Sequence, residues 1–134
     1  MPGYVLDASA MIAFLRAEPG GEIVFNLLIK KPPACLAHAV NLCEVFYDFL
    51  KAGGETAARS VISDLRAMGL LVREDMDEVF WQAVGRYKVA GKIPLADAFA
   101  ISLANRFGAE IVTTDHGDFE PLARNKVCRV LFIR

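Results

Sequence analysis

The stretch Ile111-Val112-Thr113-Thr114-Asp115 joins a run of β-branched residues to a single acid. A short run of this kind is typical of a buried strand in a sheet. Near the other end of the sequence, Tyr4-Val5-Leu6-Asp7 repeats the arrangement, with an acid directly after apolar residues. Open parallel sheets bind their ligands at the carboxyl ends of the strands. The two stretches therefore predict that Asp7 and Asp115 meet at one rim of a sheet.

Between these stretches, β-rich runs alternate with helical ones, which favours βαβ units around a parallel sheet. No internal repeat or linker interrupts the pattern, so residues 1–134 are expected to form a single domain. The predicted fold class is α/β, a three-layer α/β/α sandwich with a five-stranded parallel sheet. The expected strands are Tyr4–Leu6, Ala34–Ala37, Leu70–Arg73, Ile111–Thr114 and Arg129–Ile133. The expected helices are one capped by Ser9 that ends at Arg16, one that ends near Lys30, and Val40–Ala52, Glu55–Met68, Asp77–Val89 and Leu95–Phe107.

The composition limits the class of protein. Hydrophobic residues make up 54% of the 134 residues, above the usual ~45–50%, so some apolar surface is expected to contact a partner. No stretch is long and apolar enough to cross a membrane, and neither a signal peptide nor a CxxC motif is visible. We therefore expect a cytoplasmic protein with reduced cysteines. The net charge of −1 neither excludes nor supports a nucleic-acid partner.

Four acids are candidates for a shared site. Asp7 and Asp115 follow predicted strands, Asp97 lies in the first turn of a predicted helix, and Glu44 lies about one turn into another. Carboxylates that lie together repel one another unless a cation lies between them, and oxygen ligands suit Mg²⁺ and Mn²⁺. Each acid alone has an ordinary explanation, for example Asp97 as the partner of a helix dipole and Glu44 as part of a solvated helix face. Their conjunction predicts a metal-dependent phosphodiesterase, most simply a nuclease.

Other kinds of site have less support in the sequence. His38 and His116 are the only histidines, too few and too far apart for a zinc cluster. Ser9 has no histidine near it in the sequence, so the sequence does not indicate a Ser–His–acid catalytic triad. The glycines form neither of the two common phosphate-binding motifs, so no nucleotide cofactor is expected.

Four segments of the chain carry these acids in a recognisable order. They are Val5-Leu6-Asp7-Ala8-Ser9-Ala10, Asn41-Leu42-Cys43-Glu44-Val45, Leu95-Ala96-Asp97-Ala98-Phe99-Ala100 and Val112-Thr113-Thr114-Asp115-His116-Gly117-Asp118-Phe119. These segments resemble the motifs of the PIN domain family, in particular its small VapC-type toxin ribonucleases of type II toxin–antitoxin systems. The last segment is the most specific, and together the four extend over essentially the whole chain. The resemblance implies a PIN-like fold and an Mg²⁺- or Mn²⁺-dependent endoribonuclease.

The same resemblance implies roles for the acids. Asp7 and Asp97 would be direct metal ligands and catalytic residues. Glu44 and Asp115 would complete the catalytic cluster, as ligands or through water. Asp118 resembles an optional fifth acid of the family.

Hydroxyl groups and partner proteins are also implied by the resemblance. Ser9 and Thr114 would hydrogen-bond the carboxylates and orient them. Members of the family act as toxins, are commonly homodimers, and are inhibited by an antitoxin. The resemblance therefore implies an RNA substrate, a VapB-type antitoxin and a homodimer.

Two other functions fit a similar sheet. A phosphatase would use Asp7 as its nucleophile, but the haloacid-dehalogenase-like enzymes have a second acid two residues later, where this chain has Ser9. A catalytically silent PIN-like module would bind RNA or an antitoxin without cutting. The presence of all four acids argues against such a loss of activity.

Overall fold

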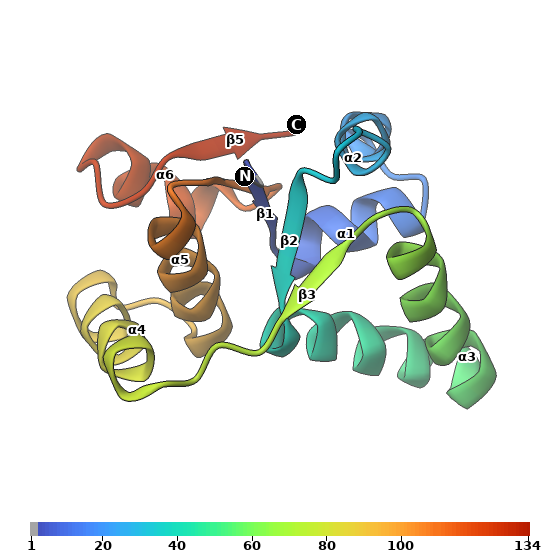
Figure 1. Cartoon of the computed structure of the whole chain (residues 1–134), viewed down its shortest axis with the longest axis horizontal. Helices are drawn as coiled ribbons and strands as arrows, with labels where there is room; N and C mark the ends of the chain where they lie inside the picture. The colour runs from blue at the N-terminus through green and yellow to red at the C-terminus, as the bar shows by residue number, and fades with distance from the viewer. Residues whose placement is uncertain (1–2) are drawn as a thin grey trace.

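Five short parallel strands form a single sheet in the order β3-β2-β1-β4-β5 (Figure 1). The computed structural model describes residues 3–134. The strands are β1 (Tyr4–Leu6), β2 (Cys35–His38), β3 (Leu71–Arg73), β4 (Glu110–Thr113) and β5 (Val130–Phe132). The helices are α1 (Ala8–Leu15), α2 (Gly21–Leu28), α3 (Ala39–Ala67), α4 (Glu78–Gly91), α5 (Leu95–Phe107) and α6 (His116–Arg124).

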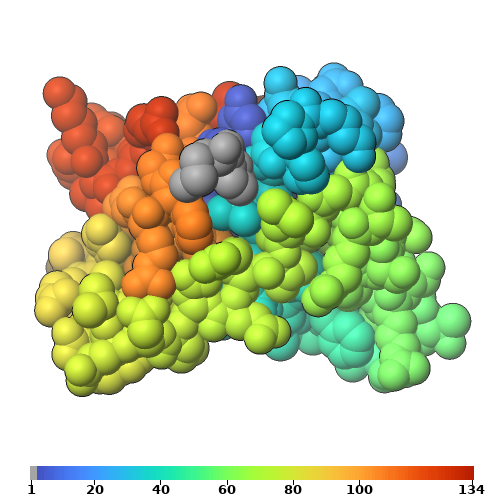
Figure 2. All heavy atoms as spheres, viewed as in Figure 1, coloured from blue at the N-terminus to red at the C-terminus, as the bar shows by residue number. Residues whose placement is uncertain are grey.

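The two faces of the sheet are covered by different helices. Successive residues of a strand point to opposite faces, and Val5 and Ile111 accordingly pack with α4, α5 and α6, whereas Leu6 and Val112 pack with α1, α2 and α3. Figure 1 shows these two groups of helices on either side of the sheet. In the space-filling view the orange atoms of α5 lie on one side of the molecule and the green atoms of α3 on the other (Figure 2). The predicted three-layer sandwich with a five-stranded parallel sheet is confirmed.

The predicted elements agree closely with the observed ones except near the two strands that carry acids. Asp7, not Ser9, caps α1, because its carboxylate accepts a hydrogen bond from the amide of Ala10. β4 ends at Thr113, one residue earlier than expected, and Asp115 caps the unpredicted helix α6. The predictions of a helix cap at Ser9 and of a strand through residue 114 were therefore wrong.

The remaining helices follow the sequence signals. α5 has the predicted bounds, and Gly108 ends it in the left-handed conformation, with φ of 64°. The expected break in α3 lies at Gly54, which has non-helical angles of φ 88° and ψ −178°. No helix within residues 3–134 has both the length and the apolar character that a membrane span requires.

A charged network fixes the start of α4. Arg106 of α5 forms ion pairs with Asp75, at 2.9 Å, and with Asp77, at 2.7 Å. Asp77 also caps α4 through the amide of Phe80. The guanidinium of Arg106 lowers the pKa of Asp77 to about 2. This network attaches α4 to α5 at the same rim of the sheet as the carboxyl end of β3.

Candidate active site at the carboxyl ends of the strands

Asp7 is held in place by the elements on either side of it. Leu6 pairs with Val112 in the parallel ladder, so Asp7 lies beside Thr113 at the end of β4. One oxygen, Oδ1, accepts hydrogen bonds from the amide of Ala10 at 2.9 Å and from Oγ of Ser9 at 2.7 Å. The other oxygen, Oδ2, accepts one from Oγ1 of Thr113 at 2.5 Å. The residue is only 4% exposed, and burial raises the pKa of its carboxyl group.

Three further acids form the tightest cluster of the site. Asp97 in the first turn of α5, Asp115 at the cap of α6 and Asp118 in the first turn of α6 each place one carboxylate oxygen within 4.8 Å of the others. We call these three residues the acidic triad. Oδ1 of Asp115 also accepts a hydrogen bond from the amide of Asp118 at 3.0 Å. The local cap of α6 thus brings two of the three acids together.

Thr113 connects the acidic triad to Asp7. Its hydroxyl donates to Asp7 and accepts from the amide of Asp115 at 3.0 Å. The sequence had instead suggested Thr114, which takes part through its backbone amide, donating to Oγ of Ser9 at 3.0 Å. Ser9 therefore contacts the carboxylate of Asp7, and the threonine that contacts it is Thr113.

The electrostatics show that the predicted acids share one environment. Burial is the main cause that raises the pKa of Asp97 to about 8. A side-chain hydrogen bond with Asp118 and repulsion from Asp7, Asp118 and Asp115 raise it further. The pKa of Glu44 is also raised, first by burial and then by the charge of Asp7. Asp7 thus lies near the acidic triad, and Glu44 lies near Asp7.

The polar atoms at this rim are suited to a divalent cation. Within residues 3–134, three buried side-chain atoms have no hydrogen-bond partner, and two of them belong to this region, Oδ2 of Asp97 and Oδ1 of Asn41. Asn41 is fully buried, and its Nδ2 donates to the carbonyl of Ala96 at 3.1 Å. A buried oxygen without a donor is costly, and a hard cation satisfies it. The residues therefore fit Mg²⁺ or Mn²⁺.

Comparison with known proteins identifies the family of this chain. The family model described as PIN domain matches residues 4–125. The chain belongs to the PIN domain family. No curated protein sequence matches this PIN domain significantly.

Solved structures share the fold of this PIN domain at low sequence identity. A toxin–antitoxin complex from Klebsiella pneumoniae has a TM-score of 0.74 at 15% identity, with 98% of each chain covered. The DNA-bound VapBC of Salmonella typhimurium has a TM-score of 0.74 at 15% identity, with 100% of each chain covered. Mycobacterium tuberculosis VapC20, a Sarcin-Ricin loop cleaving toxin, has a TM-score of 0.69 at 18% identity, with 89% of this chain and 94% of that chain covered.

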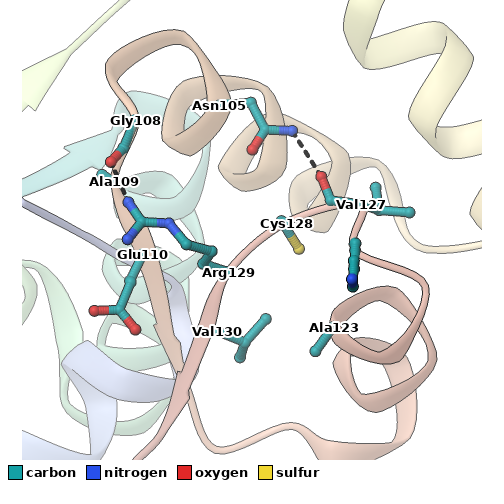
Figure 3. A pocket seen from close by; sticks show the side chains of 10 residues that line it. Asn105, Gly108, Ala109, Glu110, Ala123, Val127, Cys128, Arg129 and Val130 are labelled. Carbon is teal, nitrogen blue, oxygen red and sulfur yellow. Dashed lines mark hydrogen bonds between the residues drawn. The ribbon is translucent and has the colours of Figure 1, made fainter.

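Two hollows of this PIN domain lie in different places relative to the acids. One, of about 390 Å³, is lined by Asp118 of the acidic triad and by residues of α4, α6 and the loop after α4, and we call it the α4–α6 cavity. The larger, of about 620 Å³, lies at the opposite rim, where β4 and β5 begin (Figure 3). There Asn105 donates to the carbonyl of Val127 at 3.0 Å, and the acids of the site are absent from the lining. Of these two hollows, the α4–α6 cavity adjoins the candidate active site.

Proposed function

We propose that residues 1–134 form a single PIN domain of VapC type that hydrolyses phosphodiester bonds of RNA with Mg²⁺ or Mn²⁺. The observation that carries this proposal is the acidic triad with the buried, unpartnered Oδ2 of Asp97. Packed carboxylates with a free oxygen are unfavourable unless a cation joins them. The identification as a PIN domain and the fold shared with VapC structures support the same activity.

The proposed roles follow from the contacts of each acid. Asp97, Asp115 and Asp118 hold the cation together with Asp7, whose carboxylate three hydrogen bonds fix in one orientation. When bound, the cation lowers the pKa of a water molecule and offsets negative charge on the phosphoryl oxygens. Glu44 is half-buried and its pKa is raised by burial and by Asp7, and in this proposal it accepts a proton from the attacking water.

Partner proteins belong to the proposal as well. The Klebsiella and Salmonella structures are named as a toxin–antitoxin complex and as VapBC, which supports a VapB-type antitoxin for this chain. Large apolar side chains are exposed at Phe25 of α2 and at Ile29 directly after it, and on α4 at Val79 and Val89. Such surface suits an antitoxin and a second protomer. We propose a cytoplasmic toxin that forms a homodimer.

The test is a cleavage assay on a pool of single-stranded RNA with Mg²⁺, with Mn²⁺ and with EDTA. We expect cleavage with the cations, none with EDTA, and none from Asp115→Asn. The asparagine still offers Oδ1 to the amide of Asp118, so α6 keeps its cap. Cleavage in EDTA or by a folded Asp115→Asn variant would contradict the proposal. Release of p-nitrophenol from p-nitrophenyl phosphate, without RNA cleavage, would identify a phosphatase instead.

A further inference from the structure

The α4–α6 cavity adjoins the acidic triad and has a lining of mixed character. Its residues come from α4, from the loop that follows it, and from α6 and the segment beyond, and they are Tyr87, Ala90, Gly91, Lys92, Ile93, Gly117, Asp118, Pro121, Leu122, Asn125 and Val127. Asp118 belongs both to this lining and to the acidic triad. A molecule in the cavity therefore lies next to the position where the proposed reaction takes place.

The lining combines buried apolar side chains with exposed polar ones. Ile93 and Leu122 are 4% and 7% exposed and form an apolar floor, with the half-buried ring of Tyr87 beside them. Lys92 and Asn125 are exposed and bring a positive charge and an amide to the rim. The volume of about 390 Å³ lies at the low end of ligand pockets, roughly 300–1,000 Å³. An apolar slot with a cation at its mouth suits a flat base attached to a phosphate.

The backbone of the rim is held in a defined conformation. Lys92 ends α4 with φ of 52° and ψ of 45°, a left-handed conformation that glycine adopts without steric cost. Nζ of Lys88 donates to the carbonyl of Ile93 at 3.1 Å and so closes the loop after the helix. The loop that carries Lys92 is therefore fixed to α4.

We propose that the α4–α6 cavity binds one unpaired nucleotide of the RNA next to the cleaved phosphodiester, with its base over Ile93 and Leu122 and a phosphate at Lys92. This inference rests on the proposed ribonuclease function and names the part of the substrate that the site recognises. The cavity then contributes to the choice of cleavage position, because its walls contact a base and not only the phosphates.

The first experiment compares two lysines with the same backbone conformation. Lys126 also has a positive φ, 59°, and lines the larger hollow of Figure 3, which meets the α4–α6 cavity at Val127, but it does not line the α4–α6 cavity itself. Binding of fluorescein-labelled single-stranded RNA decamers is measured by anisotropy in EDTA at several salt concentrations. Lys92→Gly is expected to weaken binding and to reduce the slope of log K against log salt by about 0.7, the loss of one phosphate contact. Lys126→Gly is expected to leave both unchanged.

Because glycine relieves the left-handed backbone at both positions, neither variant is expected to lose stability. A thermal melt of each variant checks this. Equal RNA binding by the Lys92→Gly variant and the wild type would overturn the role of Lys92. An equal loss in both variants would also overturn it, because the effect would then come from net charge alone.

The second experiment fills the cavity. A Cβ at Gly91 would lie 3.4 Å from side-chain carbons of Ile93 and Leu122, whereas one at Gly85, in the same helix, meets no atom within 4 Å. Decamers of one bound sequence, each with a single abasic position, are tested against Gly91→Leu and Gly85→Leu. In the wild type and in Gly85→Leu, one abasic position is expected to weaken binding by about 5- to 150-fold, the usual range for one stacked base.

In Gly91→Leu that penalty is expected to disappear, since the base has no cavity to enter. An equal effect of every abasic position on binding to the wild type would overturn the inference. An unchanged penalty in Gly91→Leu would also overturn it, and this is the result expected if the cavity receives a protein segment instead of a base. Failure of the wild type to bind any RNA also overturns it. Binding without cleavage in Mg²⁺ or Mn²⁺ would instead remove the ribonuclease activity, while the comparison of the variants in EDTA still decides the role of the cavity.

Discussion

Replacing Asp97 by asparagine is expected to stabilise the metal-free protein while it abolishes cleavage. The asparagine has nearly the same shape, and its amide can donate to Asp118 where the protonated acid does. It removes the negative charge that Asp7, Asp115 and Asp118 oppose. The substitution therefore separates the effect of Asp97 on cleavage from its effect on the stability of the folded protein.

The size of the effect follows from the pKa of Asp97, which burial and its neighbours raise from 3.8 to about 8. A raised pKa means that the folded chain binds the proton more tightly than the unfolded chain. Wild-type stability therefore falls as the pH rises from about 4 to about 8 and then levels off. At about 1.4 kcal/mol per pH unit, the upper limit for the loss of wild-type unfolding free energy is about 6 kcal/mol. Because the carboxyl group is partly open to water, screening reduces this to about 2–3 kcal/mol.

Thermal melts from pH 4.5 to pH 8.5 in EDTA measure this difference. Asp97→Asn is expected to melt roughly 10 °C above the wild type at pH 8 and close to it at pH 4.5. Asp64→Asn, on the exposed face of α3, is the control and is expected to follow the wild type throughout. Mg²⁺ at ten times its dissociation constant adds about 1.4 kcal/mol to the wild type and less to the variant. A variant no more stable than the wild type at pH 8 would refute the reasoning.

Three further substitutions test other contacts. Thr113→Val removes the hydroxyl that donates to Asp7 and is expected to lower the free energy of unfolding by about 1.5–3 kcal/mol in urea titrations, whereas Thr113→Ser keeps most of it. Gly20→Ala places a Cβ 2.5 Å from a backbone carbonyl oxygen at φ of 92° and is expected to cost at least about 2 kcal/mol in the same assay. Arg106→Gln removes the ion pair that lowers the pKa of Asp77 to about 2. Wild type is therefore expected to melt above this variant at pH 7, with a difference that shrinks as the pH falls from 3.8 to about 2, and a constant difference would exclude the ion pair as its cause.

The strands were predictable because each is a short apolar run between turn residues, and α5 because proline precedes it and glycine ends it. α6 was missed for an equally local reason. Its nine residues include Gly117 and Pro121, which disfavour a helix, and its start depends on the cap formed by Asp115. The low helix propensity of this segment predicted no helix, but the side-chain cap of Asp115 outweighs that propensity.

The sequence could predict that the acids lie at one rim of the sheet, but it could not predict which side chains contact them. Which threonine contacts Asp7 depends on where β4 ends and on its register with β1, and a shift of one residue turns the side chain to the other face. Thr113, not Thr114, lies beside Asp7 because Leu6 pairs with Val112. The burial of Asn41 likewise depends on α5 packing over α3, which no spacing within α3 reveals.

The acids of the site are attached to the fold in two different ways. Asp7 caps α1 and accepts from Thr113, whose hydroxyl also holds the amide of Asp115, so one hydroxyl group positions acids from opposite ends of the chain. A substitution there removes hydrogen bonds that the fold uses, and stability and cleavage fall together. Asp97 has a buried oxygen that nothing in residues 3–134 satisfies, so its substitution moves stability and cleavage in opposite directions. A metal site built into a helix cap therefore requires two different outcomes. Substitution of Thr113 lowers both stability and cleavage, whereas substitution of Asp97 raises stability and lowers cleavage. A purely structural cluster of acids would give the same outcome at both residues.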